Sequence, residues 1–297
     1  MATEATVPAP RRSAGKRLAD LFQGRPRLTV AALLAAPLGW LVIGYLGSLG
    51  VMLVASFWHL NELSGEVTQG FSLDNYDVLF TDEVYRTIAL RTIGIAAAVT
   101  VTDVILAFPI AFYMAKVAKP RMQSLLVVAV LLPLWSSYLV KVGAWRLMLS
   151  EDGVINWALE PFGLHGPGYG TAAVWLVMSY MWLPYMIIPI YAGLERIPES
   201  ILSASEDLGA KPWRTFRKVI LPMSFPAVVA GSIFTFSLTL GDYITPANVG
   251  TKQFIGNVVY SNFVSNLPLA AAITTIPIVV MVIYLLIARK LGAFDHV

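Results

Sequence analysis

The hydrophobic and polar positions of this chain follow one another in long blocks rather than alternating residue by residue. Six blocks are apolar enough to cross a membrane, because the hydrocarbon core of a bilayer requires about 20 apolar residues in a helix. A β-barrel would instead show short stretches of alternating polarity. The pattern therefore predicts an all-α, polytopic membrane protein with about six transmembrane helices, at residues 28–57, 87–115, 124–140, 172–194, 222–240 and 267–288.

Two features inside these blocks bear on how the helices pack. Ala227 and Gly231 lie four positions apart in the fifth block, a small-xxx-small pair that permits close contact with another helix. The contact could lie within the chain or with a second subunit, and the sequence leaves both open. Prolines also interrupt the blocks and predict kinked helices, at Pro37, Pro109, Pro133, Pro184, Pro189 and Pro277.

The basic residues between the blocks predict the orientation of the chain. Residues 59–85 contain no Lys or Arg, whereas the N-terminal tail and the segments after the second, fourth and sixth blocks are rich in them. By the positive-inside rule, both termini are expected in the cytoplasm. We therefore predict a disordered cytoplasmic tail at 1–27, a transmembrane domain at 28–289 with a cytoplasmic loop at 195–221, and a cytoplasmic tail at 290–297.

Composition narrows the functional classes. Hydrophobic residues make up 57% of the 297 residues and charged residues 13%, about half the charge of a soluble domain. The chain has no cysteine, its three histidines are scattered, and it has no P-loop or hydrolase motif. The pI near 9.0 is explained by membrane topology and does not require a nucleic-acid partner. We expect no catalytic residues, no metal site and no bound cofactor.

The cytoplasmic loop has the pattern of two short helices joined by a turn. Ile201, Ala204, Ser205 and Leu208 fall on one face of the first helix, which we expect to pack beneath the spans. Gly209 suits the left-handed position just past a helix end, and Pro212 suits the first position of the next helix. On the second helix, Trp213, Phe216 and Ile220 share a face.

The stretch SASEDLGAKPWRTFRKVILP, residues 203–222, resembles the E-A-A-x-x-x-G-(x)-I-x-L-P loop of binding-protein-dependent ABC importer permeases. Ala204, Gly209 and residues 220–222 keep the pattern, while Ser203 and Ser205 stand where that family has Glu and Ala. Further stretches are similar to the first permease subunit of spermidine/putrescine-type importers: FSLDNYDVLF, LLPLWSSYLVKVGAW, LPYMIIPIYAGLERIPESIL, GDYITPANVG and IGNVVYSNF.

The resemblance implies a type I ABC importer permease fold in a prokaryotic inner membrane. It also implies two cytoplasmic ATPase subunits that bind ATP and Mg²⁺, a second permease subunit that is a paralogue, and an extracytoplasmic binding protein. The solute would be a polyamine or a related organic cation. The coupling helix of this family docks on the ATPase, which assigns ATPase coupling to Ser203, Ala204, Glu206, Asp207, Leu208, Gly209, Ala210 and Lys211.

The substrate pathway is expected to contain carboxylates and aromatic faces, because polyamines are flexible cations. Ionisable residues inside a membrane are functional candidates, and Asp103 lies in the middle of the second block. Asp103 could be satisfied by Thr100, by Thr102 or by the partner subunit. The candidates for the pathway are Asp242, Tyr243, Trp135, Trp182, Tyr185 and Asp103. For the three aromatic residues other than Tyr243, a place in the core or in the lipid belt is the alternative.

A secondary transporter and a membrane enzyme are the two alternatives to an importer permease. A secondary transporter driven by an ion gradient would show an internal repeat and paired carboxylates at the midplane. The sequence shows no clear repeat, and Asp103 has no acidic companion. A membrane enzyme would require a catalytic constellation, and none is found. The translocation subunit of an ATP-driven importer is the leading interpretation.

Overall fold

The computed structural model describes residues 26–61 and 64–290 and divides the chain into two compact units, residues 1–54 and 55–297. The tails predicted at 1–27 and 290–297 lie almost wholly outside the described residues. Helices extend to Pro26 at one end and to Lys290 at the other. Each unit is described by itself.

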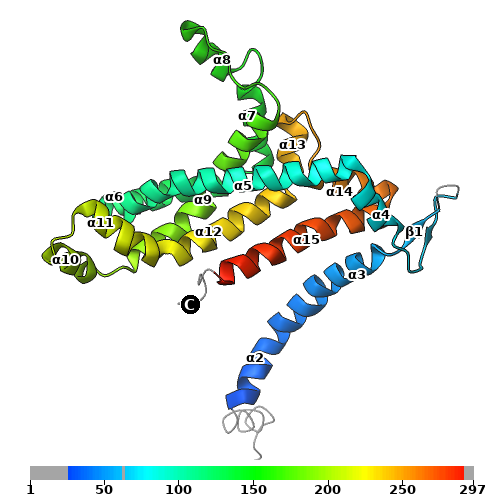
Figure 1. Ribbon diagram of the computed structural model, residues 1–297, viewed down its shortest axis with the longest axis horizontal. Helices are drawn as coiled ribbons and strands as arrows, with labels where there is room; N and C mark the ends of the chain where they lie inside the picture. Colours follow the sequence, from blue (N-terminus) through cyan, green and yellow to red (C-terminus); the bar gives the residue numbers. More distant parts are fainter. Residues whose placement is uncertain (1–25, 62–63, 291–297) are drawn as a thin grey trace, which may run out of the picture. The chain divides into compact units, whose positions relative to one another are not determined.

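The first unit contains one long helical segment (Figure 1). It comprises α2 (Pro26–Trp40), the π-helical turn η1 (Leu41–Leu46) and α3 (Gly47–Ala55). Large apolar side chains cover it, and Trp40 and Ile43 are 82% and 78% exposed. Such a surface is stable in lipid, where apolar side chains need no partner to leave water.

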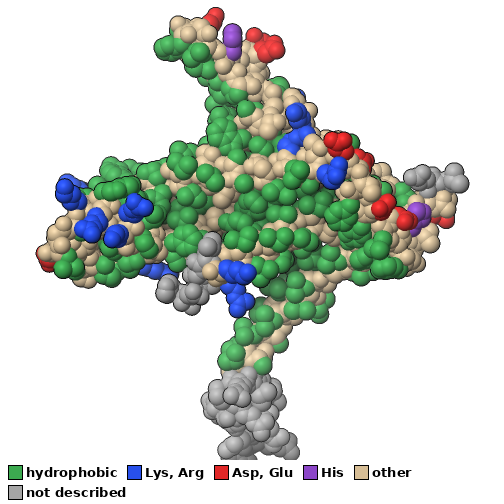
Figure 2. Space-filling model, viewed as in Figure 1, with side chains coloured by type: hydrophobic (Ala, Val, Ile, Leu, Met, Phe, Trp, Pro, Cys, Tyr) green, Lys and Arg blue, Asp and Glu red, His purple; other side chains and the backbone are tan. Residues whose placement is uncertain are grey.

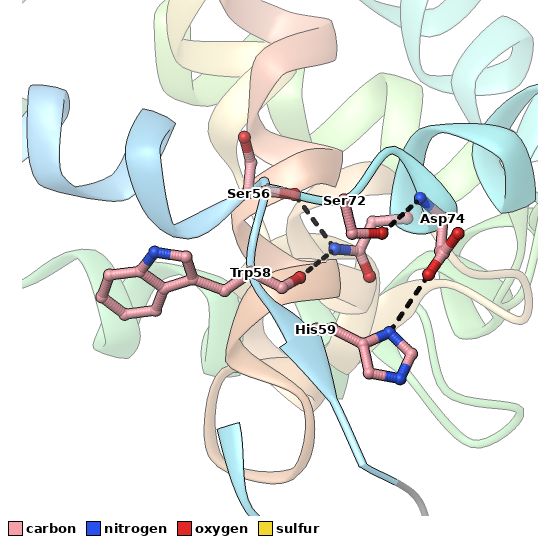
Figure 3. A network of polar contacts seen from close by, with 6 residues as sticks. Ser56, Trp58, His59, Ser72 and Asp74 are labelled. Atoms are coloured by element: carbon pink, nitrogen blue, oxygen red, sulfur yellow. Dashed lines mark hydrogen bonds and ion pairs between the residues drawn. The ribbon is translucent and has the colours of Figure 1, made fainter. Parts of the chain in front are cut away.

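The second unit begins with a polar segment that is held by side-chain hydrogen bonds (Figure 3). A short hairpin, β1 (His59–Leu60) and β2 (Val67–Thr68), precedes α4 (Asp74–Thr81). The Asn75 amide donates to the carbonyls of Ser56 and Trp58 at 3.0 and 2.8 Å. His59 Nδ1 lies 3.2 Å from a carboxylate oxygen of Asp74. These contacts hold the start of α4 against residues 56–59, at the beginning of the segment.

Four long helices form the body of the second unit: α5 (Glu83–Phe112), α9 (Thr171–Glu195), α12 (Leu221–Gly241) and α15 (Leu267–Lys290) (Figure 1). The carboxylate of Asp82 accepts the Val84 N–H at 2.8 Å and so caps the start of α5. The central helix α9 is the most buried of the four, and Val177 and Met178 on it are fully buried.

Small residues bring α9 and α12 into close contact. A Cβ added at Gly193 would overlap the Cβ of Ala227, and one added at Gly231 would lie 2.8 Å from Met186 Sδ. The small-xxx-small pair of α12 is therefore used for packing within the chain, which is one of the two alternatives that the sequence left open.

The third predicted span differs from expectation. The continuous helix expected at 124–140 is instead two helices, α6 (Pro120–Trp135) and α7 (Tyr138–Met148), which are bent by 91°. Ser136 and Ser137 between them have extended backbone, and Lys141 Nζ donates to the Pro133 carbonyl at 3.0 Å. The first helix ends two residues after Pro133, where the backbone of Ser136 becomes extended. Hydropathy alone does not report this break.

Shorter elements complete the second unit. They are η2 (Tyr113–Val117), α8 (Val154–Leu159), η3 (Glu160–Phe162), α10 (Glu199–Asp207), α11 (Pro212–Thr215), η4 (Phe216–Ile220), α13 (Ile244–Val249) and α14 (Ile255–Ser265). Among the described residues, five helices are long and apolar enough to span a membrane, or six if the α6–α7 pair counts as one span. The prediction of about six spans agrees with this count.

Candidate coupling segment and pathway site

The segment between α9 and α12 is a helical hairpin, as the sequence predicted. We call α10, α11 and η4 together the α10–α11 hairpin. Gly209 has φ +75°, and the N–H groups of Gly209 and Ala210 donate to the carbonyls of Glu206 and Ser205 at 2.7 and 3.0 Å. This is the Schellman pattern, in which a left-handed residue satisfies the last carbonyls of a helix. Pro212 begins α11.

Side-chain contacts make this hairpin stiff. The hydroxyls of Ser205 and Thr215 lie 2.9 Å apart and join its two arms. Phe216 packs edge-on against Phe108 and Phe112 of α5, with ring centroids 5.6 and 6.3 Å apart. The second arm continues without a break into α12, as one helical segment at Pro212–Gly241. The hairpin is therefore joined to this long apolar helix without an intervening loop.

The exposed face of α10 differs from the prediction. Leu208 is 88% exposed and Ile201 is 38% exposed, so these two members of the face expected to pack beneath the spans point outward. Ser205, on the same face, is half-buried and contacts Thr215. Leu202, the next position around the helix, packs into the core with Ile197 and Ile220 instead. The hydrophobic pattern of the nine residues of α10 is compatible with either rotation of the helix.

The predicted coupling residues thus lie on an accessible surface. Of the eight residues assigned to coupling, all but Ala210 are exposed. Figure 2 shows Lys and Arg side chains gathered over this end of the second unit, around α10 and α11. The exposed face of α10 itself carries Glu206 and Asp207 beside the apolar Leu208. Leu208 is thus an exposed apolar side chain with two acidic neighbours, and basic side chains lie around them.

One residue that the sequence pattern did not predict holds the base of the hairpin. Lys116, in the π-helical turn η2 that follows α5, donates to the carbonyl of Ile197 at 2.7 Å. Ile197 lies just past the end of α9, where carbonyls lack helical partners and a cation is favourable. In the sequence, Lys116 is only one of several basic residues in a loop, and it indicates which side of the membrane that loop faces. Its contact with Ile197 leaves no local pattern.

A second candidate site lies where α12 ends. A hollow of about 340 Å³ is lined by Tyr138 of α7, Trp182 of α9 and the residues around Asp242 and Tyr243. Asp242 ends α12, and its Oδ1 accepts the N–H groups of Ile244 and Thr245 at 2.9 and 3.2 Å. The same carboxylate therefore caps α13.

Tyr138 completes the contacts of the Asp242 carboxylate. The Tyr138 hydroxyl donates to Asp242 Oδ2, and its oxygen lies 2.7 Å from the Thr245 hydroxyl. Because a tyrosine has one proton to give, Thr245 donates in that second contact. Within the described part of the chain, no Lys or Arg forms an ion pair with Asp242. The contacts of this carboxylate among the described residues are therefore hydrogen bonds alone.

Aromatic rings surround this carboxylate. Tyr138 stacks on Trp182 with centroids 5.8 Å apart and planes 14° apart, and Trp182 meets Tyr185 at 5.9 Å. Tyr243 stacks on Tyr260 of α14 at 4.6 Å. The Trp182 indole N–H is buried and has no partner among the described residues. A carboxylate with stacked ring faces is an arrangement that attracts an organic cation.

Three of the six predicted pathway residues line the hollow: Asp242, Tyr243 and Trp182. Tyr185 packs on Trp182 and does not line the hollow itself. Trp135, at the end of α6, is 87% exposed and lines no part of the hollow. The sequence analysis missed Tyr138, whose position 104 residues from Asp242 gives no local signal.

Asp103 is also separated from this site. It is fully buried, and neither carboxylate oxygen has a hydrogen-bond partner among the described residues. The Ser179 hydroxyl on α9 is likewise buried without a hydrogen-bond partner among the described residues. Thr100 bonds the Ala96 carbonyl and Thr102 accepts from Trp175, so neither satisfies Asp103. Because it is enclosed between helices of its own unit, a partner subunit cannot reach it in this conformation.

Long apolar helices with an exposed helical hairpin at one end define a multi-pass membrane protein. Residues 89–293 match the family described as binding-protein-dependent transport system inner membrane component. The chain belongs to this family. It is accordingly a multi-pass inner-membrane permease subunit of an ABC importer, and the family assignment decides against the ion-gradient alternative.

Two curated relatives extend the comparison over most of the chain. The inner membrane ABC transporter permease protein YdcU of Escherichia coli (strain K12) is 44% identical over 305 residues, covering 97% of each chain. The spermidine/putrescine transport system permease protein PotB of Salmonella typhimurium (strain SL1344) is 28% identical over 257 residues, covering 84% of this chain and 88% of the relative.

A solved structure supports the fold. The bacterial ABC transporter that imports the acidic polysaccharide alginate contains a chain that superposes with a TM-score of 0.64 at 18% identity. The match covers 93% of this chain and 98% of that chain. The type I permease fold expected from the sequence is therefore confirmed at the level of architecture.

Proposed function

We propose that this permease subunit couples to a separate cytoplasmic ATPase through the α10–α11 hairpin and carries a small organic cation, with polyamines as the leading class. In this proposal the hairpin end faces the cytoplasm, as the Lys and Arg distribution predicts. A second, paralogous permease subunit supplies the other half of the pathway, and a binding protein delivers the solute from the opposite side.

The observation that carries the coupling proposal is the exposure of Leu208 on a rigid support. A leucine that is 88% exposed beside a Schellman turn offers apolar area that a docking partner can bury. Burying such a side chain is worth about 1.5–3 kcal/mol. Because η4 continues into α12 without a break, a partner that binds Leu208 and its acidic neighbours can move a membrane helix.

The hollow at Asp242 supports the cationic solute. Its carboxylate has no Lys or Arg partner among the described residues and faces tyrosine and tryptophan rings. A neutral sugar or an anionic solute would gain little from an uncompensated negative charge. The similarity to a spermidine/putrescine permease points to the same class of solute.

The binding protein and the other subunits belong to the proposal on similar grounds. One solved neighbour with a TM-score of 0.66 is an alginate transporter in complex with a periplasmic protein that holds an alginate pentasaccharide. The solute of that neighbour is acidic. Only the fold of the neighbour therefore supports the proposal, and its solute specificity does not.

The coupling proposal is tested with Leu208→Glu. Placing a carboxylate where an apolar contact is expected should reduce co-purification of the ATPase by at least about tenfold, since a lost apolar contact and a buried charge act together. Leu164→Glu is the matched control, because Leu164 is 56% exposed in the loop before α9, away from the hairpin. Equal recovery of the ATPase with both variants would contradict the proposal.

A further inference from the structure

The two oxygens of the Asp242 carboxylate have partners of different kinds. Oδ1 accepts the backbone N–H groups of Ile244 and Thr245 and so caps α13. Oδ2 accepts the Tyr138 hydroxyl, whose own oxygen lies 2.7 Å from the Thr245 hydroxyl. The partner of Oδ2 is thus a side chain, and it can leave while the cap of α13 stays intact.

Tyr138 lies directly after a bend in the chain. It is the first residue of α7, and the extended residues Ser136 and Ser137 separate it from α6 at the 91° bend. The helix α7 packs beside α13 (Figure 1). Among the described residues, the Tyr138 hydroxyl makes the hydrogen bonds that join α7 to residues 242–249. The hydroxyl can therefore leave Asp242 without the loss of a backbone hydrogen bond.

The ring of Tyr138 and its hydroxyl make separate contacts in the hollow. The ring stacks on Trp182, whereas the hydroxyl occupies Asp242 Oδ2. A quaternary ammonium is attracted by ring faces without any hydrogen bond. A primary ammonium also donates N–H groups to a carboxylate. The two kinds of cation therefore differ in whether they compete with the Tyr138 hydroxyl for Oδ2.

We propose that Tyr138 masks Asp242 in the empty permease and makes the hollow selective for cations that carry an N–H donor. This inference rests on the proposed function, because it takes the hollow as part of the solute pathway. A carboxylate has about four lone-pair sites, and three are occupied here. A primary ammonium binds first at the remaining site and then at the one that the hydroxyl leaves. A quaternary ammonium cannot replace the hydrogen bond of the hydroxyl, so the mask stays in place.

The test measures the binding of two cations to the assembled importer in phosphatidylcholine nanodiscs. The binding protein is omitted, because it would compete for the solute. Equilibrium dialysis gives the Kd of radiolabelled putrescine, a primary diamine, and of tetramethylammonium, which has no N–H. In Tyr138→Phe, the Kd of putrescine should fall about tenfold, because the solute no longer displaces a donor from the carboxylate. The Kd of tetramethylammonium should change by less than about twofold, because this cation competes for no hydrogen bond.

Tyr169→Phe is the matched control. The Tyr169 hydroxyl donates to the Arg146 carbonyl at 3.0 Å, so this variant also removes a hydroxyl contact of α7, at the end of the helix away from Asp242. Both Kd values should equal those of the wild type. Co-purification of the partner subunits shows that each variant assembles. A putrescine Kd that falls equally in Tyr169→Phe would assign the effect to a looser α7 and would overturn the mask.

The remaining outcomes for Tyr138→Phe each contradict the inference. Weaker putrescine binding would show that the hydroxyl holds the solute itself, and an unchanged Kd would show that it does not compete. Equal tightening of both cations would show a general gain in negative potential, without selection for an N–H donor.

Asp242→Asn separates this inference from the proposed function. If putrescine binds this variant as tightly as the wild type, the hollow is no part of the pathway and the proposed cationic pathway is wrong as well. If Asp242→Asn weakens putrescine binding while Tyr138→Phe leaves it unchanged, the pathway stands and the mask alone is wrong.

Discussion

At the scale of single residues, Asp242 shows how one side chain serves structure and charge together. Its Oδ1 caps α13 through two backbone N–H groups, and its Oδ2 accepts the Tyr138 hydroxyl. A carboxylate has about four lone-pair sites, so one acceptor direction remains for a ligand. The charge itself is not neutralised by any of these partners.

We predict that Asp242→Asn lowers the uptake of a polyamine by about tenfold while the complex still assembles. The amide oxygen keeps the cap of α13, and Tyr138 can turn to accept from the new amide, so the fold loses about 1 kcal/mol or less. The loss of the negative charge acts on the cation alone. ATP-dependent uptake in proteoliposomes measures it, and Asp152→Asn in the exposed turn before α8 is the control.

Normal uptake by Asp242→Asn over a full range of solute concentration would remove this residue from the pathway. A loss of uptake that extends equally to Asp152→Asn would point to a general charge effect. Assembly is followed separately, by co-purification of the partner subunits.

Residue identity made Asp242 and Tyr243 visible in the sequence, since an acid beside a tyrosine at the end of an apolar block is unusual. Tyr138 stayed invisible, because its role depends on the 91° turn between α6 and α7. Asp103 was visible for the same reason as Asp242, yet it is enclosed between α5 and α9. An acidic residue in an apolar block signals a polar role and does not indicate which cavity it faces.

At the scale of elements, the α10–α11 hairpin is a stiff joint whose turn depends on Gly209. Its φ of +75° belongs to the left-handed region, where a β-branched side chain is sterically disfavoured. A Cβ at this position would meet no atom within 4 Å. The penalty of a substitution is therefore conformational, and it acts on the angle between the two arms.

We predict that Gly209→Val gives a permease that reaches the membrane and fails in coupling. The left-handed conformation costs a residue with a Cβ about 1–2 kcal/mol, which the arms can relieve by changing their angle. ATPase association, or the stimulation of ATP turnover by loaded binding protein, should fall several-fold. Both are measured on the purified complex.

Gly163→Val is the matched control for this variant. Gly163 has φ +65° and also meets no atom within 4 Å, but it lies in the loop after η3, away from the hairpin. The same intrinsic strain should there leave coupling intact. If Gly209→Val retains both ATPase association and stimulated turnover, the hairpin is not the coupling element.

The local pattern of this element was readable, and its orientation was not. A glycine three residues before a proline predicts a turn between two helices from backbone conformation alone. The face that points outward is decided by contacts with distant residues: Leu202 packs into the core while Leu208 stays exposed. The second arm is likewise held by distant residues, through the ring contacts of Phe216 with Phe108 and Phe112.

At the scale of the whole molecule, the alternation of basic and acidic segments predicts the topology. The hairpin, the tail before α2 and the end of α15 carry the basic residues, and the segment at 59–85 carries acids alone. Positive segments are retained on the cytoplasmic side during insertion. Both ends of the chain and the hairpin are therefore expected on one side.

We predict that single cysteines at Ser64, Ser150 and Ser261 react with a membrane-impermeant maleimide from outside the cell. A cysteine at Ser203 should react only after permeabilisation. The chain contains no native cysteine, so every signal reports the introduced site, and the unmodified chain serves as the blank. External labelling at Ser203 would reverse or break the proposed topology.

The sequence by itself determined the membrane class, the approximate positions of the spans, the two-helix pattern around Gly209 and the family. These properties follow from hydropathy, charge and local backbone preference, which act over a few residues or a single block. The tertiary structure alone decided the break of the third span, the packing of Gly193 on Ala227, the enclosure of Asp103 and the meeting of Tyr138 with Asp242. Each of these depends on contacts between residues far apart in the chain, and such contacts leave no periodic mark on the sequence.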